Sequence, residues 1–167
     1  MVENEFSQGK PENEVGKEGS SVLEMRHSED SHVRRIVAGN PNTPLAVLTR
    51  LADDLSYHVR RAVAENPRSG DALLMYLASD GSSEVRMAVA ENRNTNLLTL
   101  RQLAEDGCDD VRYGLAECPH VPAEILLRLA DDENPYVRFR SMKTMQLLGL
   151  PGKLCLLTGR PLHRLYG

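Results

Sequence analysis

Charged side chains that recur along the chain are the first candidates for chemistry. An arginine and an aspartate each return every 26 residues, at Arg34, Arg60, Arg86, Arg112 and Arg138 and at Asp54, Asp80, Asp106 and Asp132. A row of arginines alone could form a basic groove for phosphate groups, whereas arginines matched by aspartates are typical of structural pairs. We interpret the two columns as a structural ladder in which each Asp supports the start of the following helix and each Arg spans neighbouring units.

The other reactive side chains give little support for catalysis or metal binding. His32 and His58 lie one repeat apart with no third ligand in their column, so we expect solvated histidines and no metal site. The three cysteines form no CxxC pair, and Cys118 replaces an asparagine of two other repeats, which predicts a small, partly buried residue. Since no Ser/His/Asp grouping and no glycine-rich phosphate loop is present, we predict no catalytic residue and no cofactor.

The repeat that carries these residues is predicted to be a pair of short helices. A first helix begins near His58, shows apolar residues at i, i+3 and i+4, and stops at Asn66-Pro67 because proline disfavours helix in the residue before it. In the preceding unit, Thr43 is predicted to cap the second helix, with Pro44 at its first position. Helices this short are marginal alone, so stability must come from stacking. The pattern predicts an all-α protein, a right-handed α-solenoid of about five 26-residue two-helix repeats in an armadillo/HEAT-like superhelix.

The ends of the chain differ from the repeats. Residues 1–19 are acidic and poor in apolar side chains, which predicts a disordered tail, and residues 20–26 resemble a degraded second helix that caps the array. The repeat domain is expected over residues 20–150. Residues 151–167 are apolar and basic and are predicted to form a tail or a terminal cap.

The repeat resembles a known family. The segment VRRIVAGNPNTPLAVLTRLADD fits the pattern VRxxVAxNPxTPxxxLxxLAxD of the variant leucine-rich repeat, a bacterial helical solenoid repeat related in architecture to HEAT and armadillo repeats. The resemblance covers about residues 20–148 and implies a curved α-superhelix, but it implies no reaction. One founding member carries an iron–sulfur cluster on a cysteine-rich segment ahead of its repeats; here no cysteine precedes Cys108, so the cluster is not carried over.

Positions that vary from repeat to repeat are the candidates for binding a partner. On the first helices these are Arg35, Arg61, Met87, Tyr113 and Phe139, and on the second helices they are Arg50, Tyr76, Arg101 and Arg128. Arginine, tyrosine, phenylalanine and methionine are enriched in protein interfaces. Ordinary solvated variation, or packing of the aromatic residues between units, is the alternative. The resemblance implies that second helices line the concave side, but the sequence does not choose between the two surfaces.

The sequence therefore predicts a non-enzymatic scaffold that binds a protein or peptide. Nucleic acid is not the expected partner, because the net charge is −4, and we expect a bacterial, cytoplasmic protein without a signal peptide or a membrane span. Two alternatives stay open. One is nucleic-acid binding or DNA-base chemistry on a basic strip formed by Arg50, Arg101 and Arg128 with Arg35 and Arg61, and the other is a cofactor-handling solenoid of the bilin-lyase or iron–sulfur kind.

Overall fold

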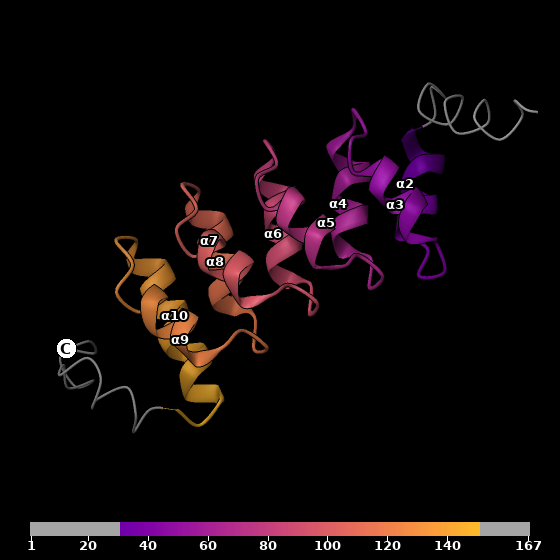
Figure 1. The fold of residues 1–167 in the computed structure, drawn as a ribbon. Helices are drawn as coiled ribbons and strands as arrows, with labels where there is room; N and C mark the ends of the chain where they lie inside the picture. Colours follow the sequence, from indigo (N-terminus) through magenta and orange to yellow (C-terminus); the bar gives the residue numbers. More distant parts are fainter. Residues whose placement is uncertain (1–30, 151–167) are drawn as a thin grey trace, which may run out of the picture.

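A computed structural model describes residues 31–150 of the 167-residue chain, and every regular element in that range is an α-helix. The predicted disordered tail 1–19, the predicted cap 20–26 and the basic tail 151–167 lie outside the described residues. Helix pairs follow one another along a single axis (Figure 1), which confirms the predicted all-α solenoid. The helices are α2 (Ser31–Gly39), α3 (Leu45–Leu51), α4 (Tyr57–Glu65), α5 (Asp71–Leu77), α6 (Ser83–Glu91), α7 (Leu97–Leu103), α8 (Asp109–Glu117), α9 (Ala123–Leu129) and α10 (Pro135–Leu147).

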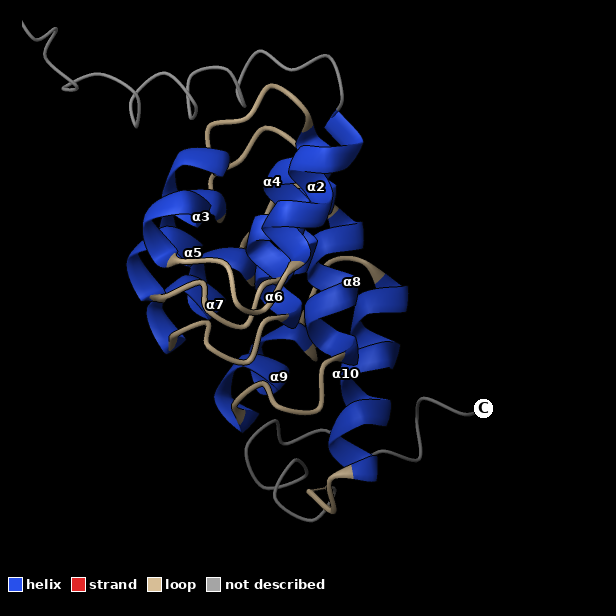
Figure 2. Ribbon diagram, turned by 90° about the vertical axis from the view of Figure 1, so that its right-hand side faces the viewer, coloured by secondary structure: helices blue, strands red, loops and turns tan. Residues whose placement is uncertain are grey.

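The helices form two rows, which Figure 2 shows side by side. The first helices of the units, α2, α4, α6, α8 and α10, each pack broadly against the next first helix. The second helices, α3, α5, α7 and α9, contact first helices and have few contacts with one another. The second-helix row is therefore the more open of the two, and grooves can form between its members.

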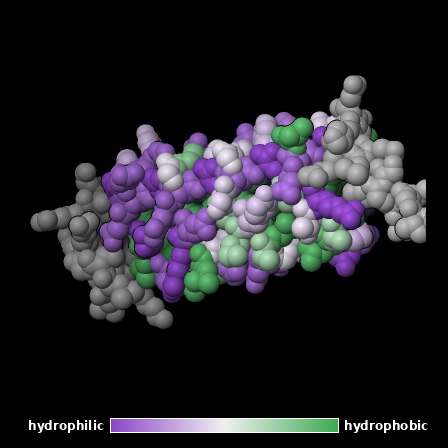
Figure 3. Space-filling view, turned by 45° about the horizontal axis from the view of Figure 1, so that its top comes forward, coloured by the Kyte–Doolittle hydropathy of each residue, from purple (hydrophilic) through white to green (hydrophobic). Residues whose placement is uncertain are grey.

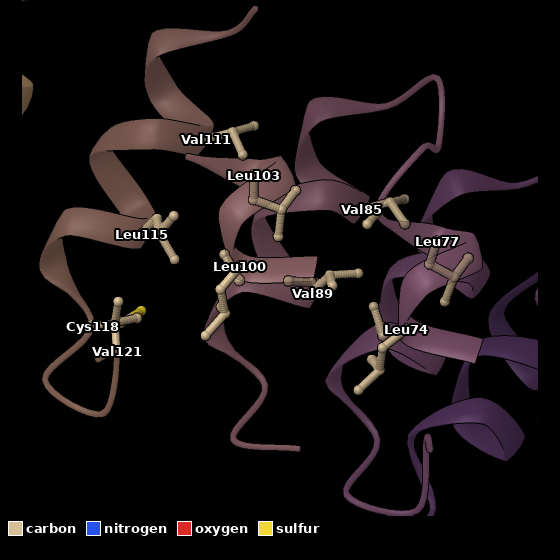
Figure 4. Close-up of a cluster of buried hydrophobic side chains, with 14 of the residues drawn as sticks. Leu74, Leu77, Val85, Val89, Leu100, Leu103, Val111, Leu115, Cys118 and Val121 are labelled. Carbon is tan, nitrogen blue, oxygen red and sulfur yellow. The ribbon is translucent and has the colours of Figure 1, made fainter. Parts of the chain in front are cut away.

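The core is built from the apolar columns that the repeat predicted. Leu100 and Leu103 of α7 lie between the valines of α6 and the pair Val111 and Leu115 of α8 (Figure 4). Burying one such side chain stabilises a fold by roughly 1.5–3 kcal/mol, so stacking provides what the short helices lack. The fully or almost fully buried columns are Val59, Val85, Val111 and Val137 and Leu48, Leu74, Leu100 and Leu126.

The predicted cap of the second helix was wrong in detail. Pro44 is the N-cap of α3, and the Thr43 side chain caps no N–H group; instead its hydroxyl donates a 2.6 Å hydrogen bond to the carbonyl oxygen of Val37. Ser69 and Thr95 form the equivalent bond to the first helices of the next two units. The hydroxyl column thus ties the loop back to the end of the preceding helix, because the free carbonyls there need donors.

Candidate partner-binding surfaces

The paired arginines of the column form bidentate ion pairs with aspartate carboxylates and further hydrogen bonds to main-chain carbonyl oxygens. Arg86 donates from Nε and Nη2 to Asp106, at 2.7 and 2.9 Å, and from Nη1 to the main-chain carbonyl oxygen of Asp80, at 2.7 Å. The aspartate bound through its carboxylate therefore lies 20 residues after the arginine, and the one bound through its carbonyl lies six residues before it. The same arrangement pairs Arg34 with Asp54, Arg60 with Asp80 and Arg112 with Asp132.

Each aspartate of these pairs also supports the next helix. Asp80 Oδ1 accepts the N–H of Ser82, the N-cap of α6, at 2.8 Å, and Asp106 does the same for Cys108 at 2.9 Å. Burial alone would raise the pKa of Asp106, but the hydrogen bonds from Arg86 and from the Cys108 N–H hold that pKa below its ordinary value. With their donors engaged in this way, the paired arginines are poorly placed to bind phosphate groups.

Arg138 ends the column without a carboxylate partner among residues 31–150. Its Nη1 donates to the carbonyl oxygens of Asp132 and Glu133. The position 20 residues later is Thr158, outside the described residues.

A second column of hydrogen bonds is formed by the buried asparagines at the ends of the first helices, which the sequence predicted only as part of the helix stop. Asn66 Nδ2 donates to the Ala38 carbonyl oxygen at 2.6 Å, and Asn92 Nδ2 donates to that of Ala64 at 2.7 Å. In the next unit Cys118 stands in this column, and its thiol donates to the Gly114 carbonyl oxygen of its own helix at 3.2 Å. The sequence signal for these bonds is that asparagine recurs at the end of successive first helices, where buried carbonyl oxygens need donors.

The first-helix ridge, defined as Arg35, Arg61, Met87, Tyr113 and Phe139, lies on the surface except at Met87. Met87 is half-buried because its side chain packs over Gly114, where an added Cβ would lie 3.0 Å from Met87 Cγ. Arg61 pairs with Glu65 of its own helix at 2.7 Å. Tyr113 and Phe139 remain exposed, as an interface on this ridge requires.

The second-helix ridge, defined as Arg50, Tyr76, Arg101 and Arg128, is cross-linked between units. The Tyr76 hydroxyl donates to Asp53 at 2.7 Å, and this bond raises the pKa of Tyr76. Arg101 pairs with Glu124 at 3.0 Å and Arg128 pairs with Glu105 at 2.6 Å.

These pairs weaken the basic strip on which a nucleic-acid function would depend. A carboxylate lies beside Arg61, Arg101 and Arg128, so the charge of each is offset locally. Arg50 is exposed and forms no ion pair within the part of the chain that the structure describes. Arg35, also exposed, contacts His32 and forms no ion pair in that range; it lies on the other row of helices, and two separated cations are a weak basis for binding a phosphate backbone.

The second-helix row is hollowed between α3 and α5. A groove of about 490 Å³ lies there, with an apolar floor and two carboxylates at its rim. Leu45 forms one wall and is 50% exposed. In Figure 3, hydrophobic side chains gather mainly in patches along the lower side of the array, while polar ones cover most of the upper side. The residues that line the groove include Leu45, Asp53, Asp71, Ala72, Leu73 and Tyr76.

Three further properties concern metal binding, membrane spanning and thiol reactivity. Among residues 31–150, no group of three or more His, Cys, Asp or Glu side chains is arranged to hold a metal ion. None of the helices between those limits has the length and apolar character needed to cross a membrane. Burial raises the pKa of the Cys118 thiol to about 11, so this cysteine is protonated at neutral pH.

The fold and its bonded columns define a helical repeat solenoid. Residues 34–93 match the family model of the Leucine Rich Repeat Variant domain. The resemblance inferred from the repeat pattern is thereby confirmed. No curated protein and no solved structure matches the chain.

Proposed function

We propose that the protein is a non-catalytic interaction module that holds a protein or peptide partner against its second-helix row. The observation that carries this proposal is the groove between α3 and α5, in which an apolar side chain of the partner would be buried. The match of residues 34–93 to the Leucine Rich Repeat Variant model supports the coarser statement that the array is a binding scaffold.

The groove exists because small residues open the start of α5. Gly70 and Ala72 leave space opposite Leu45, while the buried Leu73 forms part of the floor. Apolar area removed from water contributes about 25 cal/mol per Å², so covering the half-exposed Leu45 and an incoming side chain together favours binding. Tyr76, exposed and held by its bond to Asp53, supplies the rigid aromatic edge that is common in binding hot spots.

The repeat itself supplies substitutions that test the groove without disturbing the fold. Leu45→Asp places in α3 the residue that α5 already carries in the same column, Asp71. Ala72→Glu likewise copies the residue of α9, Glu124. Leu97→Asp is the matched control, since it makes the same change in the same column of α7, outside the groove.

The measurement is quantitative mass spectrometry of proteins that co-purify with the tagged full chain, followed by the dissociation constant of the recovered partner. We expect the partner to be lost with Leu45→Asp and with Ala72→Glu and kept with Leu97→Asp. A partner that all three variants retain to the same degree would show that the groove is not the binding site.

A further inference from the structure

A second hollow lies on the other row, at the N-terminal ends of α8 and α10. It has a volume of about 340 Å³ and is lined by Asp109, Asp110, Tyr113, Asn134, Tyr136 and Val137. The two tyrosines are 38% and 74% exposed, so part of each side chain is open to solvent beside the pocket. Tyrosine is enriched at protein interfaces, where its ring is buried and its hydroxyl keeps a polar partner.

The charge of this pocket is negative, and neither of its carboxylates forms an ion pair within residues 31–150. The Asn134 amide donates to Asp109 at 2.6 Å and holds the pKa of that carboxyl below its ordinary value. Asp110 is exposed and forms no ion pair within residues 31–150. No lysine or arginine lines the pocket. The neighbouring Arg112 has its donors on other groups, chiefly Asp132.

Further carboxylates lie on the exposed sides of α6 and α8, one in the first turn of α6 and the others at the C-terminal ends of the two helices. Glu84 and Glu91 of α6 and Glu117 of α8 are all exposed on the first-helix row. Arg140 offsets one of them, because it pairs with Glu117. The exposed sides of α6 and α8 therefore carry mainly carboxylates, whereas α10 carries Arg138, Arg140 and Lys143 and no acidic side chain.

We propose that this pocket binds a lysine or arginine side chain of a basic partner peptide. The cation lies against the Asp110 carboxylate and over the rings of Tyr113 and Tyr136. Carboxylates and aromatic ring faces are the two kinds of group that stabilise an organic cation in a protein, and here they line the same hollow.

Other occupants fit this pocket less well. An apolar side chain would remove water from two carboxylates and give them no partner in return. A metal ion would find only two acidic side chains, one of them already bonded to Asn134. Helix N-termini favour carboxylates in the first turn, but that preference does not account for two tyrosines placed at the same hollow. This pocket is separate from the α3–α5 groove and lies on the row of first helices. An experiment can therefore refute the proposal for one site without refuting the proposal for the other.

The test uses the full chain labelled with ¹⁵N and two matched peptides. The first is an acetylated, amidated hexapeptide of glycine and alanine with two central arginines, and the second has citrulline, which is neutral and nearly isosteric, in place of both arginines. Amide shifts are followed during titration at about 20 mM salt, where screening is weak. We expect the arginine peptide to shift the amides of Tyr113 and Tyr136 saturably and the citrulline peptide to bind at least tenfold more weakly.

Single substitutions separate the pocket from general electrostatic attraction. Asp110→Asn and Tyr136→Leu should each weaken binding about two- to fivefold, the size expected for an exposed ion pair or cation–π contact. Glu91→Gln removes one exposed carboxylate from α6, outside the pocket, and should leave the affinity within about twofold of the unchanged protein. Equal binding of the two peptides, or equal losses with Glu91→Gln and Asp110→Asn, would overturn the proposal.

Discussion

Arg86→Ala is expected to destabilise the middle of the array strongly, although it removes only one charged side chain. The substitution deletes both bonds to Asp106 and the bond to the Asp80 carbonyl oxygen. The Arg86 and Asp106 side chains are only 17% and 8% exposed, so the aspartate is left with little water to replace the guanidinium. One hydrogen bond, from the Cys108 N–H, would remain on it.

The magnitude follows from that burial. Removing one partner of a buried ion pair typically costs 3–5 kcal/mol, and residual solvent access at Arg86 reduces the expected loss to about 2–4 kcal/mol. Arg61→Ala is the matched control, because it deletes an arginine of the preceding unit. The side chains of Arg61 and its partner Glu65 are 44% and 46% exposed. An exposed pair of this kind in one helix contributes about 0.3–0.5 kcal/mol.

The assay is urea unfolding followed by circular dichroism, with the double variant Arg86→Ala/Asp106→Ala completing a cycle. Because the double variant leaves no buried charge unpaired, Arg86→Ala should cost at least about 1 kcal/mol less when Asp106 is already absent. Similar small losses of unfolding free energy for Arg86→Ala and Arg61→Ala, or additive losses in the cycle, would refute the interpretation of the Arg–Asp columns as structural pairs.

The same pair predicts how stability depends on pH. The pKa of Asp106 is lower in the folded protein than in the unfolded chain, so the folded state binds its proton less readily. The resulting stabilisation is complete above the unfolded pKa and is lost as the pH falls through the folded value. In Arg86→Ala, burial acts on Asp106 without the guanidinium, so this acid-side loss should shrink.

Two further predictions concern buried groups. Burial lowers the pKa of His120 in the folded protein, so the unfolded chain takes up a proton at a higher pH than the folded one. Stability should therefore fall as the pH drops below the ordinary histidine pKa. In thermal melts at several pH values, His120→Gln should lose part of this pH dependence, while His58→Gln, at an exposed histidine, should keep it. The Cys118 thiol, with a pKa of about 11, should resist alkylation by iodoacetamide at mildly alkaline pH in the native protein and react in urea; rapid native labelling would contradict the burial seen here.

The repeat columns predicted the fold because each one repeats a single local environment. Val85 and Leu100 are buried like their counterparts in the other interior units because neighbouring units cover them, whereas Val33 in the first described unit is 47% exposed. The partner of an arginine was harder to predict. The sequence did not show which aspartate binds which arginine, because one lies six residues earlier and another 20 residues later. In the folded array the end of the second helix brings the carboxylate of the later aspartate beside the guanidinium.

The candidate surfaces were predictable only in part. Exposure of Tyr113 and Phe139 followed from their column, but Met87 in the same column turns inward because the next unit has glycine at residue 114. The α3–α5 groove depends on the spacing of the second helices and on small residues in a neighbouring unit, which no single repeat reveals. Thr43 was assigned to the wrong bond because its hydroxyl can either accept from an N–H or donate to a carbonyl.

The short reach of the bonds that join the units bears on how the protein is made. Within residues 31–150, the side-chain hydrogen bonds connect positions no more than 28 residues apart, as between Asn92 and Ala64. A first helix that emerges from the ribosome can therefore complete its bonds once the next unit has been synthesised. Folding of this array can keep pace with translation, and a nascent chain would expose only its most recent unit to chaperones or proteases.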